Sequence, residues 1–281
     1  MFASVVADPS VDFSWTAWHG HPSVLAGLLV LTLGYLLGVG PLRRRYGWAP
    51  SVGSGQVFLF LSGVLVIFIA VLSPLHELGD KYLFSAHMVQ HLLLTLVVPP
   101  LLLLGTPGWL LRPLVRSPRV LNVARTLTIP VVAFILFNVV FVLWHVPGLY
   151  ELALRQRGIH VLEHLMFLAA GVIMWWPVLS PLREVPRATY LVQMVYLFVQ
   201  PTVPAILGAM ITFSDSVLYT WYVEAPRLWD ISAHTDQQVG GVIMWVPGGL
   251  AFLITLVVVF LVWAAQEESK AQPNGGGSRR I

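Results

Sequence analysis

The residues of this sequence with the clearest potential for chemistry are two pairs of histidines. His87 and His91 are four residues apart. The same spacing separates His160 from His164. Residues four apart lie on one face of an α-helix, one turn above the other, so each pair can chelate one ion. Imidazole is a good ligand for zinc, copper, iron and nickel. The two pairs therefore predict a metal site shared by two helices.

Two further side chains are candidates for the same site. His145, in the stretch Trp144-His145-Val146-Pro147, closes an apolar run and is a candidate fifth ligand. Glu163 stands beside the second pair and can accept a hydrogen bond from a ligating imidazole, as carboxylates around metal sites do. The alternatives remain open. The paired histidines can instead bond to loops or headgroups, His145 can be favoured by the helix dipole, and Glu163 can be a solvated acid.

The chain has no cysteine, which excludes disulfides and thiolate metal sites. Thioether sulfur is then the remaining soft donor, and soft donors select Cu(I). Each methionine is more often core filler than ligand. The methionines considered are Met88, Met166, Met210 and Met244.

Several polar residues near the ends of the apolar runs are accessory candidates. Asp236 can contribute a carboxylate to the same pocket. It can equally belong to a helix start, because Thr235 and Gln238 have the spacing of a capping box. Four loop histidines can capture an ion before it reaches the paired histidines, or can be merely solvated: His19, His21, His76 and His234.

The elements that carry these residues are apolar runs. The chain is 57% hydrophobic and 10% charged, whereas an average soluble domain is about 25% charged. A run of about 20 apolar residues can cross a bilayer as a helix. The sequence therefore predicts an all-α, multi-pass membrane protein. Seven runs qualify, at 23–40, 56–73, 82–104, 127–146, 159–179, 189–213 and 239–264.

The basic residues predict the orientation of these spans. Twelve of the 16 lie on one side: Arg43, Arg44, Arg45, Arg112, Arg116, Arg119, Arg125, Arg183, Arg187, Lys270, Arg279 and Arg280. By the positive-inside rule that side is cytoplasmic. This divides the chain into an extracytoplasmic segment at 1–22, a seven-helix membrane domain at 23–265 and a disordered cytoplasmic tail at 266–281. All nine histidines then fall in the outer half of the membrane or in the outer loops.

Short matches within the chain suggest repeated helical hairpins. The sequence HMVQHLLL at 87–94 resembles HVLEHLMF at 160–167, and GVIMWWP at 171–177 resembles GVIMWVP at 241–247. Spans two and three, four and five, and six and seven are then related pairs. Two spans also contain prolines that should interrupt their helices, Pro99-Pro100 in the third and Pro201 with Pro204 in the sixth.

Signatures of common enzymes are missing from the sequence. It has no HExxH motif, no glycine-rich phosphate loop and no serine in a nucleophile elbow. Topology explains the basic loops, so nucleic acid is not implied. We expect a non-enzyme. The residues alone leave three functions open: a copper-binding assembly factor, a cytochrome with bis-histidine haem, and a metal or proton transporter.

Four stretches carry a family resemblance. HMVQHLLL, WHVPGLY from Trp144, HVLEHLMFLAAGVIMWWPVL and DQQVGGVIMWVPG occur in order within about residues 20–265. Together they resemble the seven-helix CtaG family of cytochrome c oxidase assembly factors, a membrane family without the cysteines of the unrelated single-span copper chaperone of that name.

The resemblance implies a role in the maturation of haem-copper oxidases in the cell membrane. It implies copper as the cargo, oxidase subunit I as the recipient, and an extracytoplasmic copper chaperone as the source. Assigning copper to His87, His91, His145, His160 and His164 is an inference from their spacing and depth. Met88, Met210, Glu163, Asp236, His76 and His234 are then the accessory candidates.

Overall fold

The computed structural model describes residues 13–16, 18 and 22–271, and this part of the chain is helical with no β-strand. Six of its helices are long and apolar enough to cross a membrane, or seven if one bent pair is counted as a span. The predicted fold class is confirmed, and the chain is a multi-pass membrane protein.

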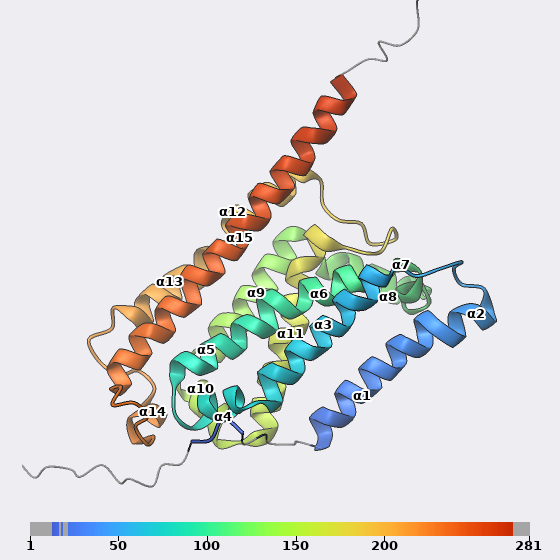
Figure 1. The fold of residues 1–281 in the computed structure, drawn as a ribbon. Helices are drawn as coiled ribbons and strands as arrows, with labels where there is room; N and C mark the ends of the chain where they lie inside the picture. Colours follow the sequence, from blue (N-terminus) through green and yellow to red (C-terminus); the bar gives the residue numbers. More distant parts are fainter. Residues whose placement is uncertain (1–12, 17, 19–21, 272–281) are drawn as a thin grey trace, which may run out of the picture.

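The helices run back and forth between the two ends of one bundle (Figure 1). In the first half they are α1 (Pro22–Leu37), η1 (Gly38–Leu42), α2 (Arg43–Tyr46), α3 (Ser54–Leu72), α4 (Pro74–Lys81), α5 (Phe84–Leu92), η2 (Leu93–Val97), α6 (Val98–Gly105), α7 (Gly108–Leu111), η3 (Arg112–Val115) and α8 (Pro118–Leu127). In the second half they are α9 (Pro130–Trp144), α10 (Pro147–Arg155), α11 (Arg157–Leu179), α12 (Tyr190–Val199), α13 (Thr202–Thr212), α14 (Thr220–Glu224) and α15 (Ala233–Ala271).

Three helical hairpins follow one plan. In each, a long helix is joined through a short helix to the next long helix: α3 through α4 to α5, α9 through α10 to α11, and α13 through α14 to α15. In the second and third hairpins the two arms pack against each other, and in the first α3 packs against η2 and α6, which continue the span that α5 begins. The three short helices lie at one end of the bundle, which we call the histidine end (Figure 1). The three predicted hairpins are therefore present.

The third span contains an irregular turn where proline was expected to interrupt it. Between α5 and α6 the chain forms the π-helical turn η2. Pro99 has no N–H for the carbonyl of Thr95, so that carbonyl needs another donor. The indole Nε1 of Trp175 supplies it at 3.0 Å. The sixth span is likewise divided into α12 and α13 at Gln200 and Pro201, as predicted.

Two predicted boundaries differ from the structure. The fourth span, placed at 127–146, is the 15-residue helix α9, and α8 joins it at a bend of 73°. The ring of Pro130 disfavours helical geometry for the residue before it, and Ile129 has a ψ of 128°. The tail expected from residue 266 is helical through Ala271, since alanine and glutamate favour helix. Its remainder lies outside the described residues.

Candidate metal centre

Helices α4, α5 and α11 bring the candidate ligands together at the histidine end. α4 crosses close to α5 because Gly79 has no side chain. A Cβ at Gly79 would lie 2.9 Å from the Cα of His87, closer than real atoms approach. The short connection between α4 and α5 therefore places His76 and Asp80 beside His87.

Asp236 fixes the start of α5 from a distant part of the sequence. Its carboxylate accepts hydrogen bonds from the backbone N–H of Phe84 at 2.6 Å and of Ser85 at 3.1 Å, and from the Ser85 hydroxyl. These N–H groups begin α5, where a negative charge also suits the helix dipole. Asp236 therefore positions the helix that carries His87 and His91.

Four side chains form what we call the four-donor cluster: His87, His160, Glu163 and His164. One ligand atom from each lies within 4.8 Å of all the others. The His87 and His160 rings, on α5 and α11, are 5.4 Å apart between centroids. Each histidine pair thus lies on one helix, as predicted. The two pairs meet because α11 packs against η2 and α6, which continue the span that α5 begins.

A second group shares His160 and extends the centre toward α4. It consists of His76, Asp80 and His160. The Asp80 carboxylate lies 3.4 Å from His76 Nε2, 3.4 Å from His160 Nδ1 and 3.7 Å from His87 Nδ1. The side-chain amide of Gln90 donates to His76 Nδ1 at 3.0 Å. Asp80 therefore links three histidines from three helices.

Asp80 is held as a carboxylate by these neighbours. Burial raises the pKa of Asp80. Contact with His87 and the charges of His160 and His76 together lower this pKa by more, so the net pKa is below the ordinary value. Asp80 is thus an anionic oxygen donor at neutral pH, which suits a cation site.

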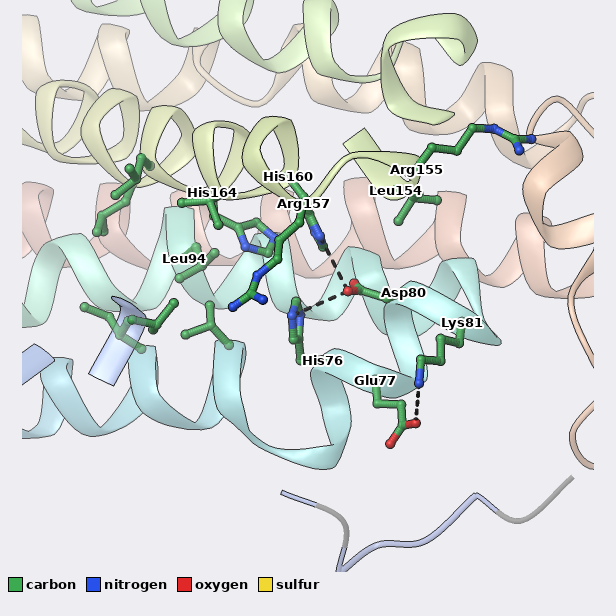
Figure 2. A pocket seen from close by; sticks show the side chains of 16 residues that line it. His76, Glu77, Asp80, Lys81, Leu94, Leu154, Arg155, Arg157, His160 and His164 are labelled. Atoms are coloured by element: carbon green, nitrogen blue, oxygen red, sulfur yellow. Dashed lines mark hydrogen bonds and ion pairs between the residues drawn. The ribbon is translucent and has the colours of Figure 1, made fainter. Parts of the chain in front are cut away.

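A cavity of about 420 Å³ opens onto this centre. Figure 2 shows His76 and His160 approaching the Asp80 carboxylate from two helices on its wall. Lys81, Arg155 and Arg157 line the same cavity. Glu77 and His164 complete the polar part of the wall, and the rest is apolar: Val24, Ile67, Val71, Leu94, Leu154, Val161, Leu165 and Leu168.

Several polar atoms of the centre are buried without a protein hydrogen bond. Within the described residues this holds for both ring nitrogens of His87 and His91 and for both carboxylate oxygens of Glu163. Buried polar groups are nearly always paired, because leaving one unpaired is costly. Clustered imidazoles and a carboxylate in this state are suited to share a cation.

The five predicted ligands lie in a continuous arrangement. Three of them, His87, His160 and His164, belong to the four-donor cluster. His91 is adjacent, with its Nε2 at 3.6 Å from Glu163 Oε1. His145 lies beyond His91, at 6.1 Å between ring centroids, and so is outside the four-donor cluster. Glu163, expected beside a ligand, has an oxygen within that cluster itself.

The accessory candidates divide between the centre and other places. His76 joins the centre, and Met88 is buried next to it. Met210 is 65% exposed on the apolar surface. His234 Nε2 bonds the carbonyl of Ser214 at 2.9 Å, and among the described residues His234 is in neither group of clustered donors. His19 and His21 lie outside the described residues.

The predicted capping box at Thr235 is also wrong. The Ser232 hydroxyl caps α15 by accepting from the backbone N–H of Thr235 at 3.0 Å. The helix thus begins earlier, at Ala233. Asp236 does lie in the first turn of α15, as the helix-start interpretation predicted, and its carboxylate bonds the start of α5.

Two residues of the centre were missed from the sequence, Asp80 and Gln90. Asp80 follows His76 by four residues, and Gln90 lies between the paired histidines. The spacing of His76 and Asp80 was an available signal, because it places both on one face of a helix.

Fold and centre together define a class: a multi-pass membrane protein with a buried histidine and carboxylate centre at one end of its bundle. The chain belongs to the family of cytochrome c oxidase caa3 assembly factors, whose model matches residues 33–266. No solved structure matches the chain.

Mycobacterial proteins resemble most of the chain. Uncharacterized proteins of Mycobacterium leprae, Mycobacterium bovis and Mycobacterium tuberculosis are each 28% identical over 94% of it. The chain spans 42% of the length of these relatives, so they contain a large further portion.

Proposed function

We propose that this assembly factor is a non-enzymatic copper carrier of the cell membrane. Copper binds at the four-donor cluster and passes to the catalytic copper centre in subunit I of a haem-copper oxidase. The family supplies the role in oxidase assembly, and the metal and its transfer are our inference.

One observation carries the proposal. Three imidazoles and a carboxylate from two membrane helices lie within 4.8 Å of one another, and one of these helices, α5, is fixed by Gly79 and Asp236. Imidazole binds copper well. The arrangement therefore fits a small cation better than a purely structural role for the histidines.

The surroundings support loading from water and release within the membrane. The cavity beside the cluster is lined partly by charged side chains, with His76 and Asp80 among the polar residues, and partly by apolar side chains. In our proposal this end faces outward, because the arginines gather at the other end. An extracytoplasmic copper chaperone delivers copper at this cavity. Exchange of histidine ligands with the oxidase then moves the ion sideways.

Removal of the second histidine pair tests the proposal. The variant His160→Ala with His164→Ala should remain in the membrane and lose the copper that copurifies with the wild-type protein. Oxidase activity of membranes should fall when this variant replaces the wild type. Metal is measured by mass spectrometry of detergent-purified protein. Oxidase activity is measured as cytochrome c oxidation.

His234→Ala is the matched control, because this histidine lies at the same end but bonds a loop carbonyl. Its copper content should equal that of the wild type. Unchanged copper and oxidase activity in the double variant would refute the cluster as the copper site. A Soret band in the purified wild type would favour the cytochrome, and metal or proton flux in liposomes would favour the transporter.

A further inference from the structure

A second, smaller cavity lies deeper in the bundle than the four-donor cluster. Its volume is about 30 Å³, enough for one water or one ion. Aromatic and aliphatic groups form most of its wall, from α5, α9, α13 and α15. Four side chains on that wall carry ligand atoms: His91, His145, Met88 and Met244. These are two imidazoles and two thioethers, all buried.

His145 is prepared to act as a ligand. Its Nδ1 lies 2.6 Å from the carbonyl oxygen of Phe141, and only a protonated Nδ1 can donate to a carbonyl. The proton is therefore on Nδ1, which leaves Nε2 with a free lone pair. Within the described chain this Nε2 is buried and has no hydrogen-bond partner. Ligating histidines commonly have their other nitrogen held in this way.

The opposite wall supplies a second imidazole and the sulfur atoms. His91 and His145 are 6.1 Å apart between ring centroids. Met88 lies three residues before His91 on α5, and Met244 is on α15. In a chain without cysteine, two thioethers beside two imidazoles are the softest donor set available. Such ligands select monovalent copper over divalent ions.

We propose that His91, His145, Met88 and Met244 form a second metal site, specific for a soft monovalent cation, Cu(I). His91 lies between this site and Glu163 of the four-donor cluster. It can therefore hand an ion from one to the other. The inference rests on the proposed function in taking copper as the metal, but none of its four ligands belongs to the four-donor cluster.

Replacement of both sulfur atoms tests this site. The full-length protein in detergent is loaded with Cu(I) under reducing conditions, and with Ag(I) as a soft ion that does not change its oxidation state. We expect X-ray absorption at the copper edge to detect sulfur ligands in the wild type. Met88→Leu with Met244→Leu conserves side-chain volume. It should abolish the sulfur signal and weaken Cu(I) and Ag(I) binding at least 10-fold.

The control is Met210→Leu, which removes a methionine exposed outside the bundle and should bind as the wild type does. A wild-type copper shell without sulfur, or unchanged Cu(I) affinity in the double methionine variant, would overturn the second site. If the second site fails in this way but the variant His160→Ala with His164→Ala still loses its copper, the proposed function remains supported. Sulfur-bound Cu(I) that survives in the histidine variant, with oxidase assembly intact, would instead support the second site and refute the proposed function.

Discussion

At the scale of single residues, Glu163 is the side chain whose position most needs a chemical explanation. It is 1% exposed, and neither oxygen has a hydrogen-bond partner in the described part of the protein. Its oxygens lie 3.6 Å from His91 Nε2 and 3.9 Å from His160 Nε2. An isolated buried carboxylate is strongly destabilising. A cation shared with these imidazoles removes that penalty.

Replacement of Glu163 by its neutral isostere should therefore weaken metal binding without loss of the fold. We expect Glu163→Gln to lower copper affinity by about 10- to 100-fold, as changes around metal ligands typically do. Competition with a copper chelator measures the affinity. Glu267→Gln, an exposed acid near the end of α15, is the control. Wild-type affinity in Glu163→Gln would show that its carboxylate does not serve the site.

At the scale of elements, the three short helices at the histidine end hold one another. Trp221 Nε1 of α14 donates to the Asp80 carbonyl at 2.8 Å, and the Tyr222 hydroxyl donates to the Gly79 carbonyl at 2.7 Å. Glu151 of α10 in turn accepts from the backbone N–H and the hydroxyl of Thr220, both at 2.7 Å. The position of α4 beside the candidate metal centre thus depends on α10 and α14.

Glu151 makes this arrangement depend on pH. Burial raises its pKa, but hydrogen bonds from Thr220 and Trp221 and the charge of Arg155 lower it below the ordinary 4.5. A pKa lowered by folding contributes stability above the unfolded value, and that contribution is lost as the pH falls through the folded value.

Glu151→Gln should therefore lower the melting temperature at pH 7, by about 2–4 °C for the loss of a helix cap. The difference from the wild type should shrink below about pH 4.5. Thermal unfolding in detergent, followed by circular dichroism across this range, provides the measurement. Glu224→Gln, at an exposed position in α14, should show no such difference. A difference in melting temperature between the wild type and Glu151→Gln that stays constant with pH would contradict the assigned role of the Glu151 charge.

At the scale of the whole molecule, the two ends of the bundle differ in chemistry. The short helices α4, α10 and α14 lie at one end, and α2, α7 and α8 lie at the other (Figure 1). The latter end carries the arginine-rich segments, including α2 with Arg43, Arg44 and Arg45. Basic segments are retained on the cytoplasmic side, so the histidine end should face outward.

The absence of cysteine allows a direct test of this orientation. Single cysteines replace Ser51, in the loop between α2 and α3, and Asp215, in the loop between α13 and α14; both positions are exposed. In intact cells a membrane-impermeant thiol reagent should label Asp215→Cys and leave Ser51→Cys unlabelled until the membrane is opened. The unmodified protein is the background control. The reverse labelling pattern would mean that the metal centre faces the cytoplasm.

The sequence by itself determined features that depend on local spacing. Apolar length predicted the helices, and the four-residue spacing predicted that each histidine pair shares a helix face. The prolines predicted the interruptions in the third and sixth spans. These predictions hold because helix geometry and membrane thickness fix them within one segment, whatever the rest of the chain does.

Only the tertiary structure decided which faces meet. Packing of α11 on the third span, at η2 and α6, joined the histidine pairs, and the close crossing at Gly79 added Asp80 of α4. Packing of α15 brought Met244 to His145 and left Asp236 to cap α5, while Met210 turned outward. Such contacts join residues far apart in sequence, and helical periodicity is the same whichever neighbour a face finds, so no spacing along the chain could distinguish them.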